Sequence, residues 1–157
     1  MSAFRQRQRL RDLPIAAGGM SAIEFALVAP ILSTLAIGML DFGLGMWHQM
    51  QVGNAARAGA QYAHSHGWNS TAIQSAVTSA TSLSGVTATP APAQVCGCPS
   101  TSSGVTTATC GTTCSNGELA PYYITVGAQA SYSLILPWPG VSSPVTLSAT
   151  SIARQYP

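Results

Sequence analysis

Residues 19–40 read GMSAIEFALVAPILSTLAIGML, an apolar stretch that begins just after a basic N-terminal segment. No side chain between Phe25 and Leu40 is charged, and the apolar character continues on both sides of this core. A helix rises about 1.5 Å per residue, so about 20 such residues cross the hydrocarbon core of a bilayer. The stretch therefore predicts a membrane-spanning helix, which Pro30 would bend but not forbid.

Two acidic side chains, Glu24 and Asp41, lie at the two ends of this apolar core. If the span is centred near Ser33, each lies about 12–14 Å from the bilayer midplane. Their cost in free energy is then well below the roughly 2.5–3.5 kcal/mol quoted for a charge at the centre of a helix. We therefore expect the two acids to lie near opposite membrane interfaces.

The other charges are few and unevenly placed. Charged residues make up 6% of the chain, and four of its six positive charges lie within residues 5–11. Beyond this cluster no set of basic side chains could neutralise several phosphates, so we expect no nucleic-acid partner. By the positive-inside rule, residues 1–19 form a basic cytoplasmic leader and the chain beyond Trp47 is exported.

Beyond the apolar core, residues 49–63 are rich in alanine and contain no proline. They predict that the membrane helix continues out of the bilayer as one long rod. A second, weaker helix is expected at residues 71–83, with Asn69 or Ser70 as its cap.

Strand patterning is clearest near the C-terminus. Apolar and small residues alternate with polar ones over residues 124–136 and again over residues 145–153, which predicts two antiparallel strands with one buried face each. Two strands cannot stand alone, so we expect them to pack on the 71–83 helix or on the exported rod. The expected fold class is α+β: a long N-terminal transmembrane helix with its extension, residues 20–63, and a small disulfide-containing head, residues 64–157.

All four cysteines lie in one Ser/Thr/Gly-rich segment, as CGC, then eleven residues, then CGTTC. An even number in an exported segment favours two disulfides, and neither pair has the two-residue spacing typical of zinc knuckles. Three connectivities are possible. A bond within CGC would close an awkwardly small ring, so we expect both of its cysteines to bridge to the CGTTC pair. The candidates are Cys96, Cys98, Cys110 and Cys114.

The chain offers little for catalysis or metal binding. Its acids are divided among the leader, the membrane segment and the head, where Glu118 stands alone, so no carboxylate pair lies in one compartment. No GxSxG-type turn presents a serine, and a chain without lysine has no P-loop. His64 and His66 could share a metal, but no third ligand is near them in sequence. We therefore expect no catalytic residues, no metal, no cofactor and no enzymatic activity.

Glu24 admits three interpretations. It can be an interfacial residue of a simple single-pass anchor, where its negative charge interacts favourably with the positive, N-terminal end of the helix dipole. The apolar stretch can instead be part of a secretory signal peptide, although its character continues through Trp47, as in a retained span. Finally, Gly19 can end a prepilin leader. Cleavage before Met20 would free an amine, which the carboxylate of Glu24 one helical turn along would neutralise.

Three segments of this region also resemble TadE-like proteins, the pseudopilins of the Tad (Flp) pilus system. They are SAIEFALVAPIL, which contains Glu24, Phe25 and Pro30, then Asp41-Phe42-Gly43, and finally NAARAGAQYA at residues 54–63. The resemblance covers about residues 19–63, under a third of the chain.

The resemblance implies a minor pilin-like component of a pilus machine, anchored in the inner membrane with its head outside the cytoplasm. It also implies cleavage between Gly19 and Met20 by a prepilin peptidase. The expected partners are the lipid bilayer, that peptidase, and other pilin-like and Tad assembly subunits through helix packing. A different class stays open, namely a single-pass anchor with an adhesive or ligand-binding head, whose contact surface would be formed by Tyr122, Tyr123, Trp138 and the loop that carries the cysteines.

Overall fold

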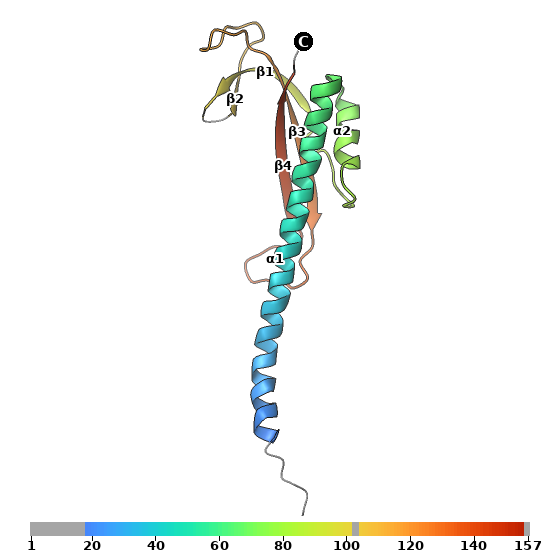
Figure 1. The fold of residues 1–157 in the computed structure, drawn as a ribbon, viewed down its shortest axis with the longest axis vertical. Coiled ribbons are helices and arrows are strands. Elements are labelled where there is room, and N and C mark those ends of the chain that lie inside the picture. The colour runs from blue at the N-terminus through green and yellow to red at the C-terminus, as the bar shows by residue number, and fades with distance from the viewer. Residues whose placement is uncertain (1–17, 102–103, 156–157) are drawn as a thin grey trace, which may run out of the picture. The chain divides into compact units, whose positions relative to one another are not determined.

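The computed structural model describes residues 18–101 and 104–155. In chain order, Figure 1 shows α1 (Gly18–His66), α2 (Ser70–Ser79), β1 (Ala93–Ser100), β2 (Gly104–Thr107), β3 (Tyr122–Tyr132) and β4 (Val145–Arg154). Contacts divide the chain into two compact units, Met1–Leu40 and Asp41–Pro157, so that α1 contributes to both. Most of the expected basic leader, residues 1–17, lies outside the described residues.

The predicted membrane helix and its rod form one helix, α1. Pro30 lies inside it and does not interrupt it. The helix continues to His66, beyond the predicted end of the rod at Ala63. It ends where Gly67 takes a φ of +80° and donates its N–H to the carbonyl of Ala63. Glycine is common at this position because other residues are strained in the left-handed conformation.

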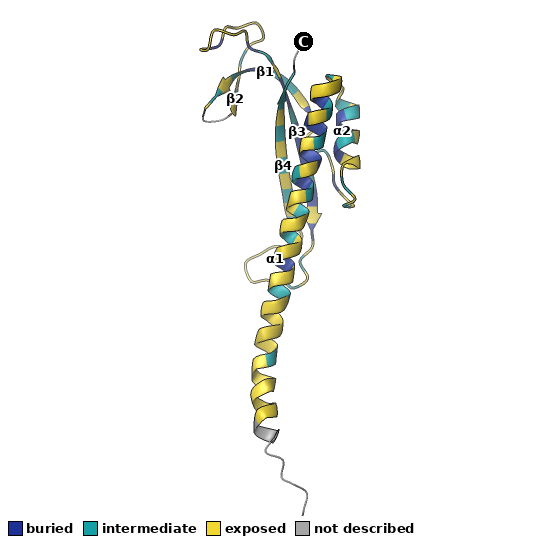
Figure 2. Ribbon diagram, viewed as in Figure 1, coloured by how far each residue is buried: buried dark blue, intermediate teal, exposed yellow. Residues whose placement is uncertain are grey.

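Most apolar side chains in the described part of the first unit are exposed. Ile23 is 67% exposed, Phe25 71% and Leu27 70%. Figure 2 shows this part of α1 as exposed over most of its length. By length and composition, the helical residues Ser21–His66 contain a window that could cross a membrane, and none of that window is buried. The prediction of a helix able to span a bilayer is therefore confirmed.

Helix α2 begins as predicted but ends earlier. The side-chain oxygen of Asn69 accepts a 3.1 Å hydrogen bond from the N–H of Ala72 and so caps the helix. The pattern predicts a helix to Leu83, whereas α2 ends at Ser79. The hydroxyl of Thr81 accepts a hydrogen bond from the N–H of Leu83 and donates one to a side chain of α1. Side-chain bonds of this kind compete with those of a helix.

The head contains a four-stranded antiparallel sheet in the order β2-β1-β3-β4. The predicted hairpin is its β3–β4 half, which pairs Tyr123 with Arg154 at one end and Tyr132 with Val145 at the other. The alternation predicts a first strand that reaches Leu136, whereas β3 ends at Tyr132. Beyond it, the N–H of Leu134 donates to the hydroxyl of Ser143, and the N–H groups of Ile135 and Leu136 donate to the side chain of Asp41 on α1.

The sequence pattern does not predict β1 and β2. Glycine and proline interrupt the alternation of β1, which reads AQVCGCPS, and β2 has only four residues. Two disulfides, Cys96–Cys110 and Cys98–Cys114, tie β1 to the segment between β2 and β3. This pairing agrees with the expected bridging of the CGC pair to the CGTTC pair.

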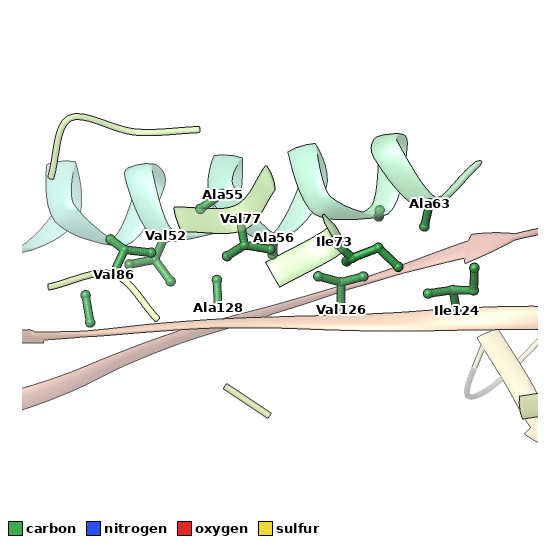
Figure 3. Close-up of a cluster of buried hydrophobic side chains, with 12 residues drawn as sticks. Val52, Ala55, Ala56, Ala63, Ile73, Val77, Val86, Ile124, Val126 and Ala128 are labelled. Atoms are coloured by element: carbon green, nitrogen blue, oxygen red, sulfur yellow. The ribbon is translucent and has the colours of Figure 1, made fainter. Parts of the chain in front are cut away.

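The core of the head lies between α1, α2 and β3, as Figure 3 shows. Residues of α1 contribute mostly small side chains, whereas α2 and β3 contribute Ile73, Val77, Ile124 and Val126, which are fully buried. Full burial of a side chain of this size stabilises the fold by about 1.5–3 kcal/mol. The predicted α+β class, with strands that pack on both the rod and the second helix, is confirmed.

Candidate functional site

The carboxylate of Asp41 is the centre of a cluster of hydrogen bonds in the head. The Tyr132 hydroxyl donates to Oδ1 at 2.8 Å, and the N–H of Ile135 donates to Oδ1 at 3.0 Å and to Oδ2 at 3.2 Å. The N–H of Leu136 and the indole Nε1 of Trp138 donate to Oδ2 at 3.3 and 3.2 Å. Asp41 is only 4% exposed. We call this set the Asp41 cluster.

The cluster explains why β3 ends at Tyr132. A carboxylate offers about four acceptor positions, which these donors fill. Without the Asp41 carboxylate, the N–H groups of Ile135 and Leu136 would need partners on β4 or in water. The connection between β3 and β4 is thus held by hydrogen bonds to Asp41, which is the first residue of the second unit.

Tyr132 is held from a second side as well. Its ring lies edge-on to the imidazole of His48, with 4.9 Å between ring centroids. Gly45 faces the same ring, since a Cβ at Gly45 would lie 3.8 Å from it. Burial raises the pKa of the Tyr132 hydroxyl, and the hydrogen bond to Asp41 adds to this rise. The hydroxyl therefore remains a proton donor to Asp41 in neutral solution.

The other residues of the Asp41-Phe42-Gly43 motif do not join the cluster. Phe42 is 71% exposed, and a Cβ at Gly43 would meet nothing within 4 Å. Of the three, only Asp41 has a role that the head itself explains.

The NAARAGAQYA motif, residues 54–63, supplies the packed face of α1. Its residues Ala55, Ala56, Ala60 and Ala63 are all buried. Between them, a Cβ at Gly59 would lie 2.5 Å from Cγ2 of Val77 and 2.8 Å from Cγ1 of Val126. Such distances leave no room for a side chain, so small residues let α1 approach α2 and β3 closely. We call these five residues the small-residue face.

The predicted processing residues lie elsewhere. Gly19 and Met20 belong to the first turns of α1, but their side chains lie outside the described residues. Glu24 is exposed on the same helix, as are Phe25 and Pro30. The structure therefore assigns the two acids of the apolar stretch to different units, with Glu24 in the first and Asp41 in the second.

The two histidines do not converge. Nδ1 of His64 lies 3.0 Å from the carbonyl oxygen of Arg154, whereas His66 stacks on Tyr62 with 4.4 Å between ring centroids. Both belong to the last turn of α1 rather than to the predicted loop. Among residues 18–101 and 104–155, no group of three His, Cys, Asp or Glu side chains is placed to hold a metal ion.

The three aromatic residues expected at the contact surface of an adhesive head lie apart. Tyr122, at the start of β3, is 50% exposed, but Tyr123 is buried. Trp138 follows the other end of β3, about 33 Å away at about 3.3 Å per strand residue, and bonds to Asp41. These three aromatic residues do not form one surface.

Sequence reasoning missed the partners of Asp41, which lie more than 90 residues from it along the chain. One signal pointed to them. An acid at the end of an apolar helix, with no basic residue a turn away, needs hydrogen-bond donors from another segment wherever it is buried from water.

Comparison with known protein families matches part of α1. Residues 19–61 fit the family model described as TadE-like protein. No curated protein and no solved structure matches the chain. The matched range covers most of α1, including Asp41 and most of the small-residue face, and stops before α2 and the sheet. Residues 19–61 are thus similar to the TadE-like family, in agreement with the resemblance seen in the sequence.

Proposed function

We propose that this chain is a single-pass, pseudopilin-like component of Tad (Flp) pilus assembly. One observation carries the proposal. The TadE-like range coincides with a helix whose first part exposes its apolar side chains and whose second part packs into a folded head. A helix of this kind suits a subunit that is held in a bilayer by one end. Its role is structural rather than catalytic, and it offers helix surface to neighbouring pilin-like subunits.

The proposed topology places the N-terminus in the cytoplasm, α1 in the inner membrane and the head outside. The arginines within residues 5–11 favour this orientation by the positive-inside rule. The two disulfides of the head support it, because such bonds persist in oxidising compartments and are rare in the cytosol.

Processing by a prepilin peptidase would remove residues 1–19. The mature chain would then begin at Met20, and Glu24 would be its fifth residue. The carboxylate of Glu24 could neutralise the new amine, either in the same chain or in a neighbouring subunit. Either pairing lowers the cost of a charge near lipid.

The processing step is tested by the intact mass of the protein from cells with and without the peptidase. We expect a chain shortened by 19 residues only where the peptidase is present. Gly19→Val should block the shortening, whereas Gly43→Ala, at a position where a Cβ meets nothing within 4 Å, should not. A chain of full length in both strains would defeat the processing claim.

Assembly is tested separately with Glu24→Gln. We expect fewer assembled pili, while the protein still resists alkaline extraction from membranes. The matched control is Glu118→Gln, which alters an acid in the head that is 53% exposed. A normal number of pili with Glu24→Gln would contradict the role of this carboxylate, and extraction of the wild-type chain would contradict membrane anchoring.

A further inference from the structure

The connection between β3 and β4 is apolar and exposed. It comprises residues 133–144, SLILPWPGVSSP, which we call the 133–144 loop. It contains no charged residue. Ile135 is 55% exposed, Val141 49% and Trp138 36%, and Figure 2 shows most of the loop as exposed. An exposed loop of a soluble domain is normally polar, so this composition needs a reason.

The position of the loop in the head follows from contacts along α1. Gly59 faces Val126, and Gly45, further back along the helix, faces Tyr132. β3 therefore runs antiparallel to α1 and ends near Asp41. The loop lies at the end of the second unit where the chain continues into the apolar residues 18–40.

The Asp41 cluster fixes the loop at this level. Three of its donors, the N–H groups of Ile135 and Leu136 and the indole of Trp138, belong to the loop. Asp41 directly follows Leu40, the last residue of the apolar core. If Ser33 lies at the midplane, Asp41 is about 12 Å along the helix, close to the half-thickness of about 15 Å of the hydrocarbon core.

We propose that the 133–144 loop is a second membrane contact, which lies in the headgroup region of the bilayer that α1 spans. The inference rests on the proposed single-pass anchoring. Tryptophan is enriched at this depth because its ring is apolar while its N–H needs a polar partner. Here Asp41 supplies that partner and leaves the body of the Trp138 ring, with Ile135 and Val141, to contact lipid.

The chemistry of the loop sets the kind of contact. Without lysine or arginine, it gains nothing from the surface charge of anionic lipids. Its contact is hydrophobic and interfacial. We therefore expect it in zwitterionic and anionic bilayers alike and at low and high salt. This contact of the loop with the headgroup region limits how far α1 can move along the bilayer normal.

The test measures the depth of Trp138 with the full chain in phosphatidylcholine vesicles. The protein has three tryptophans, so Trp47→Phe with Trp68→Phe keeps Trp138 as the only one. Lipids brominated near the headgroup should reduce its emission more than lipids brominated deep in the acyl chains. Aqueous iodide should quench it weakly, and replacing part of the lipid with phosphatidylglycerol should change neither result.

Two control variants show how a tryptophan in water and a tryptophan in the apolar segment respond to the same quenchers. A chain with Trp68 alone reports an exposed position after the end of α1, and we expect strong iodide quenching and no loss with brominated lipid. A chain with Phe25→Trp and the native tryptophans replaced by phenylalanine reports the apolar segment itself. We expect it to lose emission with brominated lipid. Protected backbone amides in β3 would show that each variant remains folded.

The outcomes separate this inference from the proposed function. If brominated lipid quenches Phe25→Trp but not Trp138, the helix is in the bilayer and the loop inference is overturned. If it quenches neither, the single-pass anchoring fails first. If Trp138 resists both iodide and brominated lipid, protein covers the loop, and a contact between subunits replaces the contact with lipid.

Discussion

The hydroxyl of Tyr132 donates a 2.8 Å hydrogen bond to the carboxylate of Asp41, a residue 91 positions earlier in the chain. This bond joins the end of β3 to the first residue of the head unit on α1. Around it, the same carboxylate accepts N–H groups from the 133–144 loop. The acid that marks the end of the apolar stretch is thus also the residue that organises this end of the head.

Replacing Asp41 should therefore loosen the loop. Asp41→Ala leaves the Tyr132 hydroxyl, two backbone N–H groups and an indole N–H without their common acceptor, so we expect the midpoint of thermal unfolding to fall by roughly 5–10 °C. Asp41→Asn keeps one acceptor oxygen and should lower it less. The measurement is thermal unfolding of the full chain in detergent, with Glu118→Ala as the exposed-acid control. Equal midpoints for Asp41→Ala and Glu118→Ala would show that the cluster adds no stability.

Stability should also fall at alkaline pH through Tyr132. Burial, aided by the bond to Asp41, raises the pKa of this hydroxyl above its ordinary 10.0. The unfolded chain then loses the proton at lower pH than the folded one. Stability from this group is complete below pH 10.0 and declines as the pH rises through that value toward the folded pKa.

The comparison of variants isolates this effect. Tyr132→Phe should lower stability at neutral pH, since it loses the bond to Asp41, but it should flatten the alkaline decline. Tyr122→Phe, at a half-exposed position, should leave the decline unchanged. The readout is the denaturant midpoint from about pH 8 to about pH 11. A decline of the same slope in Tyr132→Phe would rule out this tyrosine as its source.

Gly59 allows the closest approach of α1 to its neighbours. Gly59→Val places atoms where Val77 and Val126 already lie, so we expect a loss of about 1–3 kcal/mol in the free energy of unfolding, or more if the helix is displaced. Gly53→Ala is the matched control, because a Cβ there meets nothing within 4 Å. Alanine should even raise stability by up to about 1 kcal/mol through helix propensity. Urea unfolding compares the two, and a neutral Gly59→Val would mean that the small-residue face is not closely packed in solution.

The disulfides should stabilise one part of the head more than the rest. Cys98 and Cys114 are separated by 16 residues, and a loop of about this length corresponds to about 3 kcal/mol in the chain-entropy model. In Cys98→Ala/Cys114→Ala we expect faster hydrogen exchange at Ala108 and Ala120, whose N–H groups bond within this region. Amides of β3 facing the α1 core should remain protected. Uniform loss of protection across β3 would contradict this separation.

Much of this architecture is encoded locally. The uncharged residues 25–40 predict the membrane segment, the alanines near Arg57 predict the rod, and the alternation over residues 124–136 predicts β3, although the strand ends at Tyr132. Each of these signals lies within one element, so a period or a composition is enough to find it.

The remaining features depend on contacts between distant segments. β1 lacks alternation because its cysteines and Gly97 serve the disulfides and the close approach of β2, where a Cβ would lie 2.5 Å from Cγ1 of Val105. The end of β3 at Tyr132 depends on Asp41, which no local pattern connects to it. The stop of α2 at Ser79 depends on a hydroxyl that bonds across to α1.

The disulfide-bonded part of the head has a buried cluster of its own, formed by Cys96, Cys114 and Ala120, apart from the core that α1 shares with α2 and β3. A protein divided in this way can change one part without disturbing the other. Insertions, deletions and new side chains between β1 and β3 would leave α1 and its packing against α2 and β3 intact. Related chains can therefore differ in the disulfide-bonded part while they keep the core between α1, α2 and β3.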